Sequence, residues 1–298
     1  MSDFRLKVFQ AVAKNLSFTK ASQELFVTRP AITKHIQELE AAYQTRLFDR
    51  QGSRISLTES GKLLLEHCER ILEDYKRLEY EMHLLHNEYT GGLKLGASTT
   101  IAQYVLPPLL ASFIGKFPQV NLSLLNGNSR EIEAALQEHR IDLGFVEGVF
   151  RLPNIKYTTF LEDELVAVVR TGSKLAVGEE ITPEELLHLP LVLRERGSGT
   201  LDVFERALQQ HNIKLSSLQV LMYLGSTESI KLFLEHTDCL GIVSVRSITR
   251  ELYSGQLRVV EIKGMPMLRD FSFAQPQGQE SGLAQVFMQF AMHNNHKL

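Results

Sequence analysis

The chain has little of what marks a secreted, membrane-bound or metal-clustered protein. It has two cysteines and no tryptophan among 298 residues. Cys68 and Cys239 are far apart, which argues against a disulfide framework and against a cysteine-based metal site. No apolar run approaches the ~20 residues of a membrane-spanning helix, and the first residues lack the apolar segment of a signal peptide. We therefore expect a cytoplasmic protein with no membrane partner. The cysteines are expected to pack, with a redox role left open.

The composition is typical of a soluble globular protein of two or three domains. Hydrophobic residues make up 44% and charged residues 22% of the chain, and its length exceeds what one small core fills. The formal net charge of −3 is unevenly distributed. Residues 1–58 carry nine Lys/Arg against five Asp/Glu, whereas residues 59–90 carry four against eight. A basic first segment on a mildly acidic chain indicates a DNA-binding module joined to other domains.

Residues 17–57 have the pattern of two short helices, separated by a tight turn and followed by a basic hairpin. Ser17 and Thr28 each precede an amphipathic run and are predicted to cap these helices, with Pro30 tolerated in the first turn of the second. In the second helix, apolar positions recur at steps of four, three and four and form one stripe: Ile32, Ile36, Leu39 and Tyr43. An earlier helix closes a three-helix core with Leu6, Phe9, Ala13 and Leu16.

The other face of the second helix carries long or hydroxylated polar side chains that can reach base edges and phosphates. The hairpin has Gly52-Ser53 at its tip and an arginine on each side, placed to enter an adjacent minor groove. These cations alone are also typical of a solvated surface, but the order of a helix, two capped helices and a basic hairpin favours DNA binding. We predict that double-stranded DNA is bound by Ser17, Thr28, Arg29, Pro30, Thr33, Lys34, Gln37, Arg50 and Arg54.

A long helix is predicted from about Glu59 to about Tyr89. Its apolar residues are spaced alternately by four and three, which forms a heptad seam of more than three repeats. The seam predicts a homodimer, because two heads on two half-sites multiply a weak single contact. The alternative is a helix that lies on its own domain. The seam consists of Leu64, Cys68, Ile71, Tyr75, Leu78, Met82, Leu85 and Tyr89. A domain boundary is predicted at 90–92, where two glycines follow Thr90.

From Leu93 onward, short apolar runs alternate with helical segments. This alternation predicts an α/β fold with largely parallel sheets. The candidate strands are Leu93–Ala97, Val120–Leu125, Ile141–Val146, Leu165–Arg170, Leu189–Leu193, Val220–Leu224 and Gly241–Val243.

Hydroxyl-rich and glycine-rich segments follow several of these strands and begin helices. Ligands of parallel α/β sheets lie at the carboxyl ends of strands, and helix N-termini there attract small anions. Arg194 or Arg196 could clamp such an anion, and Glu147 could accept a hydrogen bond from a ligand amine or from one of these arginines. Each hydroxyl taken alone is more often only a helix cap. The candidate effector residues are Ser98, Thr99, Thr100, Asn128, Glu147, Arg194, Arg196, Gly197, Ser198, Gly199, Thr200, Ser226 and Thr227.

Catalytic patterns are weak in this chain. Ser17 and Lys20 fit the Ser-x-x-Lys pattern of penicillin-recognising enzymes, but the companion motifs are missing and the serine serves better as a cap. His293 and His296 lack the glutamate of a metalloprotease helix. We therefore expect no enzyme activity, metal or cofactor. The stronger rival to a regulator is a cytoplasmic small-molecule-binding protein with no regulatory role on DNA.

The first segment resembles the winged helix-turn-helix of LysR-type transcriptional regulators. The matching motifs are Ser17-Phe-Thr-Lys-Ala-Ser22, Val27-Thr-Arg-Pro-Ala-Ile-Thr-Lys-His-Ile36, Leu39-Glu40, Leu47-Phe-Asp-Arg50 and Leu57-Thr-Glu-Ser-Gly61. With the long helix and the α/β remainder, the resemblance spans essentially the whole chain. It implies a winged helix-turn-helix at 1–58, a dimerisation linker helix at 59–90 and an effector domain at 91–298.

The resemblance further implies that the effector domain is similar to periplasmic binding proteins, with an inducer cleft between two α/β subdomains. The first covers about 91–161 and 268–298, and the second about 162–267. Homodimers are expected to assemble into a homotetramer, with RNA polymerase as a further partner at the promoter. This chain has Thr28-Arg29 where many members have Ser-Gln, so the resemblance carries over no half-site sequence.

Three motifs of the effector domain resemble the branch of the family associated with cysteine biosynthesis and sulfite response. They are Gly127-Asn-Ser129, Phe145-Val-Glu-Gly148 and Leu193-Arg-Glu-Arg-Gly-Ser-Gly-Thr200. The resemblance implies sulfite or another small sulfur oxyanion as the effector. A carboxylate metabolite suits the same helix starts equally well.

Overall fold

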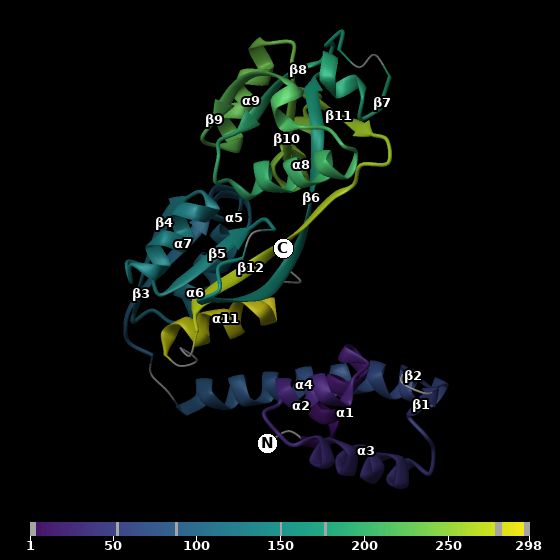
Figure 1. Ribbon diagram of the computed structural model, residues 1–298. Coiled ribbons are helices and arrows are strands. Elements are labelled where there is room, and N and C mark those ends of the chain that lie inside the picture. The colour runs from purple at the N-terminus through teal and green to yellow at the C-terminus, as the bar shows by residue number, and fades with distance from the viewer. Residues whose placement is uncertain are drawn as a thin grey trace. The chain divides into compact units, whose positions relative to one another are not determined.

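The computed structural model describes residues 4–51, 54–86, 89–149, 151–175, 178–277 and 282–294 (Figure 1). The chain divides into two compact units, residues 1–88 and residues 89–298. In the part of the chain that the structure describes, no helix is both long and apolar enough to cross a membrane.

The first unit is a three-helix head with a two-stranded hairpin and a long helix. Its elements are α1 (Phe4–Asn15), α2 (Phe18–Glu24), α3 (Arg29–Tyr43), β1 (Phe48–Gln51), β2 (Arg54–Leu57) and α4 (Glu59–His86). The hairpin strands are antiparallel, with Gln51 opposite Arg54. The core is formed by the apolar faces of the helices. The centroid of the Phe48 ring lies 5.5 Å from that of Phe9 and 5.9 Å from that of Phe18.

The helix caps follow the sequence only in part. Ser17 accepts a hydrogen bond from the Lys20 amide, as predicted for the cap of α2. Thr28 holds the N-cap position of α3, but its side chain makes no capping hydrogen bond, so that part of the prediction is wrong. Pro30 lies in the first turn of α3 as expected, where a missing amide leaves no helical bond unmade.

In both α1 and α3 the last apolar position of the predicted stripe lies outside the core. Ile32, Ile36 and Leu39 are buried, whereas Tyr43 is 55% exposed and Leu16 is 48% exposed. Both stand at helix ends: Tyr43 is the last residue of α3, and Leu16 follows α1 with a positive φ of 45°. The chain turns away from the core at both positions.

The apolar residues of α4 serve two different surfaces. Cys68 and Leu72 are buried in the core of the head, and the Cys68 thiol donates to the Leu6 carbonyl at 3.3 Å. Tyr89 lies beyond α4 in the second unit, with its ring 5.6 Å from that of Phe117. The predicted seam is therefore wrong for Cys68 and Tyr89. The start of α4 packs on its own head, and further along the helix Ile71, Leu78 and Met82 are exposed.

The second unit has two lobes joined by two long strands, as Figure 1 shows. The first lobe contains β3 (Gly91–Ser98), α5 (Thr99–Tyr104), α6 (Leu106–Lys116), β4 (Val120–Gly127), α7 (Ser129–Gln137), β5 (Leu143–Glu147) and α11 (Leu283–Asn294). The second contains β7 (Glu180–Ile181), η1 (Glu185–His188), β8 (Pro190–Arg194), α8 (Gly199–Gln210), η2 (Leu215–Ser217), β9 (Gln219–Leu224), α9 (Thr227–His236), β10 (Leu240–Ser244), η3 (Val245–Ser247), α10 (Thr249–Tyr253) and β11 (Leu257–Ile262). The crossing strands are β6 (Ile155–Arg170) and β12 (Met267–Pro276).

The strands of this unit form a sheet with the order β4-β3-β5-β12-β6-β10-β8-β9. Pairing within each lobe is mainly parallel, whereas β12 and β6 run antiparallel to each other and to their neighbours. The α/β class is confirmed, and all seven candidate strands are present. The sequence did not predict β7, β11, β12 or the first half of β6.

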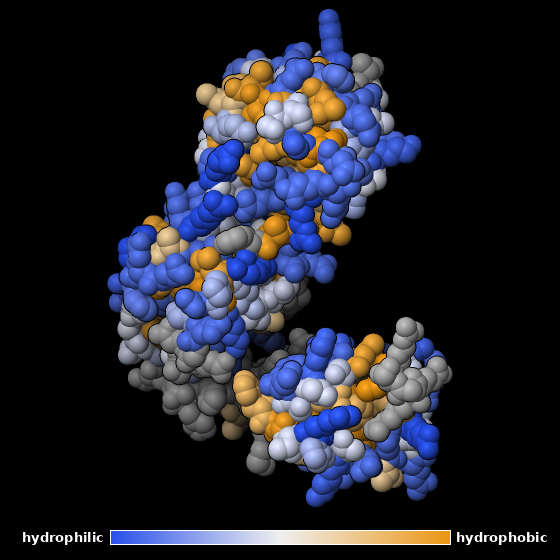
Figure 2. Space-filling model, viewed as in Figure 1, coloured by the Kyte–Doolittle hydropathy of each residue, from blue (hydrophilic) through white to orange (hydrophobic). Residues whose placement is uncertain are grey.

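Each lobe has its own core. Aromatic rings dominate in the first lobe, where Phe113 lies 4.8 Å from Phe287 and Phe145 lies 5.1 Å from Phe273, measured between ring centroids. Leucine, isoleucine and valine side chains fill the second lobe on both faces of its strands. In Figure 2 the viewed face of the second unit is mainly hydrophilic, with apolar residues gathered in patches.

Candidate functional site

The recognition surface expected on the head lies on the exposed side of α3. Lys34 and Gln37 are exposed on the side opposite the buried stripe, and Thr28, Arg29 and Pro30 are exposed where the helix begins. The Thr33 hydroxyl donates to the Arg29 carbonyl at 3.1 Å within the helix. The Ser17 hydroxyl is used by its cap. The surface that remains carries two cations and one amide, which suits phosphate and base contacts.

The hairpin after α3 has the geometry of a wing. Arg50 pairs with Ile55, and Gln51 with Arg54, across two antiparallel strands. Gly52 and Ser53 at its tip lie outside the described residues, as do the side chains of Arg50 and Arg54.

In the second unit, predicted effector residues lie at the carboxyl ends of parallel strands. Ser98 ends β3, Glu147 ends β5 and Arg194 ends β8. The Ser98 hydroxyl donates to the Glu147 carboxylate. The Ser129 hydroxyl donates to the Glu147 carbonyl at 2.8 Å and fixes the backbone there. The structure thus brings Ser98 and Glu147 together in the first lobe.

Arg269 on β12 is the cation that pairs with Glu147, at 3.4 Å from Nη1 to Oε1. The expectation that Arg194 or Arg196 faces Glu147 is therefore wrong. Arg269 also donates from Nε to Asp163 at 2.7 Å and from Nη1 to the Thr200 hydroxyl at 3.1 Å. Because Thr200 lies on α8 of the second lobe, Arg269 connects both lobes through the strand that crosses between them.

Sequence reasoning missed Arg269 and its partner Asp163. Both side chains are fully buried, and Asp163 also accepts from Ser244 at 2.7 Å. The sequence held one signal for Arg269, because it shares the alternating phase of the buried residues of β12, Met267, Phe271 and Phe273. A cation in the inward phase of a strand needs a buried partner.

Arg194 is buried, and its guanidinium binds the neighbouring carboxylate of Glu195, where we expected it to bind a ligand anion. Its Nε and Nη2 donate to the two oxygens of Glu195 at 2.8 and 3.0 Å, and Nη2 also reaches Thr99 at 3.4 Å and the Gly225 carbonyl at 3.3 Å. Within the described residues, Arg194 Nη1 and the buried hydroxyl of Thr100 have no hydrogen-bond partner. Arg196 is exposed.

Three of the predicted ligand residues act as helix caps. Ser198 accepts from the Leu201 amide at 3.2 Å, Ser226 from the Ser229 amide at 3.1 Å, and Asn128 from the Glu131 amide at 3.0 Å. The cap alternative is therefore correct for these three side chains.

The remaining predicted positions shape the contact between the lobes. Gly197, with a φ of 92°, accepts at its carbonyl from the Arg130 amide at 3.3 Å. At Gly199, an added Cβ would come within 2.3 Å of the Glu147 carbonyl oxygen. Glycine at 199 therefore permits the approach of Glu147, where we expected an approach by a ligand. Thr227 is buried in the first turn of α9.

A second polar cluster also joins the lobes. Tyr104 on α5 donates to the carboxylate of Glu228 on α9, and Lys231 pairs with Glu228 at 2.7 Å and with Glu251 at 2.8 Å. Burial alone would raise the pKa of Glu228, but hydrogen bonds from Lys231 and Tyr104 hold that pKa below its ordinary value. The cluster therefore keeps a charged carboxylate at the lobe contact.

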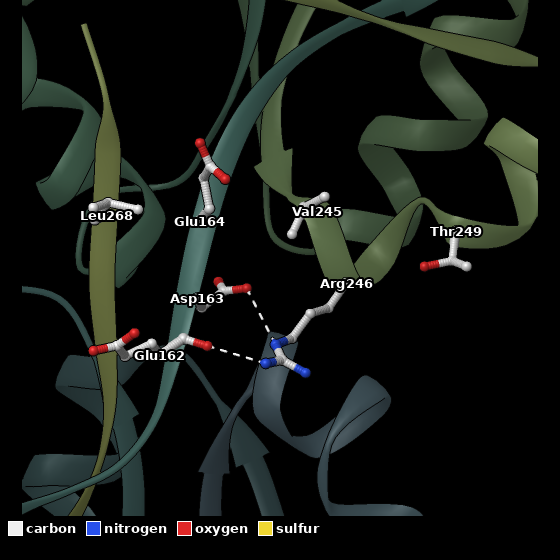
Figure 3. A pocket seen from close by; sticks show the side chains of 7 residues that line it. All are labelled: Glu162, Asp163, Glu164, Val245, Arg246, Thr249 and Leu268. Carbon is white, nitrogen blue, oxygen red and sulfur yellow. Dashed lines mark hydrogen bonds and ion pairs between the residues drawn. The ribbon is translucent and has the colours of Figure 1, made fainter. Parts of the chain in front are cut away.

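Two open hollows flank the crossing strands. One, of about 420 Å³, is shown in Figure 3, where Arg246 reaches toward Asp163 and the main chain of Glu162. The other, of about 350 Å³, is lined by Gly148, Val149, Arg151, Glu162, Asp163, Arg206, Leu268, Arg269 and Asp270. Neither hollow is lined by Thr100 or Arg194. The lobes are in contact where Gly199 approaches Glu147 and where Arg269 donates to Thr200.

The head and the two-lobed unit together define a class, the helix-turn-helix regulators that carry a ligand-binding domain. Residues 4–62 match the family described as bacterial regulatory helix-turn-helix protein, LysR family, and residues 86–295 match the LysR substrate binding domain. The chain belongs to the LysR family of transcriptional regulators, whose members bind DNA and small-molecule effectors.

Individual relatives are also regulators. The chain is 35% identical to the uncharacterized HTH-type transcriptional regulator YeiE of Escherichia coli over 87% of this chain and 85% of YeiE. It is 28% identical to the HTH-type transcriptional regulator CysL of Bacillus subtilis over 90% and 89% of the two chains. The regulatory domain of CcmR from Synechocystis PCC6803, solved in complex with 2-PG, is 27% identical; the match covers 68% of this chain and 97% of that domain, with a TM-score of 0.62.

Proposed function

We propose that this LysR-type regulator binds promoter DNA in the cytoplasm through α3 and the β1–β2 hairpin, and that a small anion bound between its lobes modulates this binding. The residues proposed to contact DNA are Thr28, Arg29, Pro30, Thr33, Lys34, Gln37, Arg50 and Arg54, with Ser17 holding α2 in place. The exposed cations of α3, Arg29 at its start and Lys34 opposite the buried stripe, support this assignment.

The observation that carries the effector site is a pair of unsatisfied buried groups. Arg194 is 1% exposed and Thr100 is 0% exposed, and within the described residues neither Arg194 Nη1 nor Thr100 Oγ1 has a partner. Thr99, next to Thr100 in the chain, already contacts Arg194 at 3.4 Å. Since a guanidinium only donates hydrogen bonds, the ligand that satisfies it must present an acceptor. An oxyanion does so with charge assistance.

Sulfite, or another small sulfur oxyanion, is the proposed effector. The sequence motifs at 127–129, 145–148 and 193–200 support it, as does the similarity to CysL. The CcmR regulatory domain was solved in complex with 2-PG, which supports a small-molecule site in the similar domain of this chain. The rival reading, a binding protein with no role on DNA, is not favoured, because YeiE and CysL are both named as HTH-type transcriptional regulators.

In the proposed mechanism, the anion changes how the two lobes close. Closure alters the packing of homodimers within a homotetramer, so the heads are respaced along the promoter and access for RNA polymerase changes. The exposed Ile71, Leu78 and Met82 of α4 are the proposed dimer contact.

Binding of sulfite to the full chain, followed by calorimetry, tests the effector site. Thr100→Val keeps the shape of the side chain and removes the hydroxyl, so we expect sulfite affinity to fall by about tenfold, the loss of one hydrogen bond to a charged group. Thr159→Val is the matched control, because Thr159 is a threonine on β6 that contacts Asp270. Equal sulfite affinity of wild type and Thr100→Val would exclude this position. The absence of binding in wild type would exclude sulfite.

A further inference from the structure

The carboxylate of Glu147 lies among groups of the kinds that bind oxyanions. Its side chain is 1% exposed and faces the guanidinium of Arg269, which is 0% exposed, at 3.4 Å. The buried hydroxyl of Ser98 donates to the same carboxylate. An arginine and a hydroxyl are the donors that a ligand oxyanion would be expected to meet.

A helix N-terminus completes these surroundings. The 12-residue helix α8 begins at Gly199, and a Cβ added there would lie 2.4 Å from Glu147 Cγ. The first turn of α8 therefore lies directly against the Glu147 side chain. The free amides and the partial positive charge of a helix N-terminus stabilise a nearby anion. Thr200, the next residue of α8, is held to Arg269 at 3.1 Å.

The charges of this centre are balanced without a ligand, because Arg246, at 3.6 Å from Asp163, is a second cation beside Arg269. Arg269 is shared between Asp163, at 2.7 Å, and Glu147. A second anion placed beside Glu147 would meet a like charge where little water screens it. A ligand oxyanion can use Ser98 and Arg269 only where the Glu147 charge is removed or displaced.

We propose that Glu147 is a resident anion: its carboxylate fills an anion-binding position formed by Ser98, Arg269 and the start of α8, and it competes with oxyanion effectors for that position. The inference rests on the proposed effector site between the lobes and identifies the residue that limits its affinity for anions. It also accounts for lobes that are in contact without a ligand, since Glu147 supplies from within the chain the charge that an effector would bring.

Chemical rescue of the full chain tests the proposal without a known effector. Glu147→Ala removes the carboxylate and leaves a space of similar size to acetate. We expect about 0.1 M acetate to raise the Tm of this variant by about 3 °C over chloride at equal ionic strength, with a shift below about 1 °C for wild type. Glu133→Ala is the matched control, because Glu133 is also a buried carboxylate of the first lobe but its partner is Tyr157. An equal acetate shift in all three proteins, or none in any, would refute an anion position at Glu147.

Glu147→Gln gives a second measurement if the alanine variant does not fold. Glutamine keeps an acceptor for Ser98 and removes the charge, so we expect sulfite to bind about tenfold more tightly than to wild type, with Glu133→Gln unchanged. Equal affinity of Glu147→Gln and wild type would refute competition by Glu147 while leaving the effector site intact. Acetate rescue in a chain that binds no sulfite would instead uphold the resident anion and exclude sulfite as the effector.

Discussion

Tyr104 of the first lobe donates a hydrogen bond to Glu228 of the second lobe. Burial raises the pKa of the Tyr104 phenol, and the hydrogen bond to Glu228 raises it further. The phenol therefore remains a donor across the physiological pH range. The Lys231 ammonium lies 5.4 Å from the centre of the Tyr104 ring and pairs with Glu228. One tyrosine thus connects the lobes through a hydrogen bond that does not titrate near neutral pH.

Tyr104→Phe removes this connection without changing the ring. We expect closure of the lobes to weaken by about 1.5–3 kcal/mol, the usual contribution of a hydrogen bond to a charged group. Hydrogen exchange should then become faster in α5 and at the start of α9. Tyr157→Phe is the matched control, because its hydroxyl bonds to Glu133 within the first lobe. Unchanged exchange in both helices of Tyr104→Phe would show that the lobes are held elsewhere.

The two cysteines are predicted to be unreactive in the folded chain. Burial raises the pKa of each thiol to about 11, with a further rise from Glu69 at Cys68 and from Asp238 at Cys239. Since the thiolate is the reactive form, labelling by a disulfide reagent at pH 8 should be at least about 100-fold slower in native protein than in guanidinium. Because the folded state holds these protons more tightly, the free energy of unfolding should fall as the pH rises from about 9 to about 11. Rapid labelling of the native protein would contradict this prediction and would favour a redox role for one of the cysteines.

Arg29 is predicted to contribute to the sequence preference of the head. It is exposed at the start of α3, so Arg29→Ala should reduce affinity for the preferred site by about 1–3 kcal/mol and relax preference at one base position. Arg54→Ala, in the hairpin, should instead weaken all sites similarly and reduce the salt slope by about one. Binding to a randomised set of sites, sequenced before and after selection, distinguishes these effects. A uniform loss for Arg29→Ala would make it a phosphate contact.

Leu78 is predicted to lie in the dimer contact of α4. It is 52% exposed and lies on one side of the helix with Ile71 and Met82. Leu78→Glu should raise the dimer dissociation constant at least about 100-fold, because it places charge in an apolar seam. Leu63→Glu is the control: Leu63 is 60% exposed but projects about 80° away from the centre of the stripe of Ile71, Leu78 and Met82, and about 60° from Leu78 itself. Sedimentation equilibrium measures both, and equal dissociation constants would place the contact elsewhere.

Local pattern predicted the elements of this chain better than their partners. Helical periodicity located α3, a heptad spacing located α4, and apolar runs bounded by turn residues located seven strands of the second unit. The strands β11 and β12 were missed because charged residues interrupt their apolar runs, as Arg269 and Asp270 do in β12. Both strands pair with β6, which is distant in the sequence, so the pattern of neighbouring residues does not reveal the pairing.

The sequence predicted where the candidate site residues lie in the fold, at the ends of strands, but not which side chains they contact. The parallel strands β3 and β5 bring Ser98 and Glu147 to one edge of the first lobe, as parallel topology requires, whereas Arg194 ends β8 of the second lobe. The side chain that pairs with Glu147 is Arg269, 122 residues further along the chain. Arg194 instead donates to its neighbour Glu195. Hydroxyls at helix starts are ambiguous in sequence, since a cap and a ligand contact need the same residue. Asn128, Ser198 and Ser226 proved to be caps.

DNase footprinting of the full chain on its own upstream intergenic region, at about 0.15 M salt, tests the central claim most directly. We expect protection of two half-sites on one face of the duplex, with a changed spacing or bend when sulfite is added. Thr100→Val should keep the protection and lose the change. The absence of any dimer-sized footprint at all salt concentrations, with and without sulfite, would contradict the regulator proposed here.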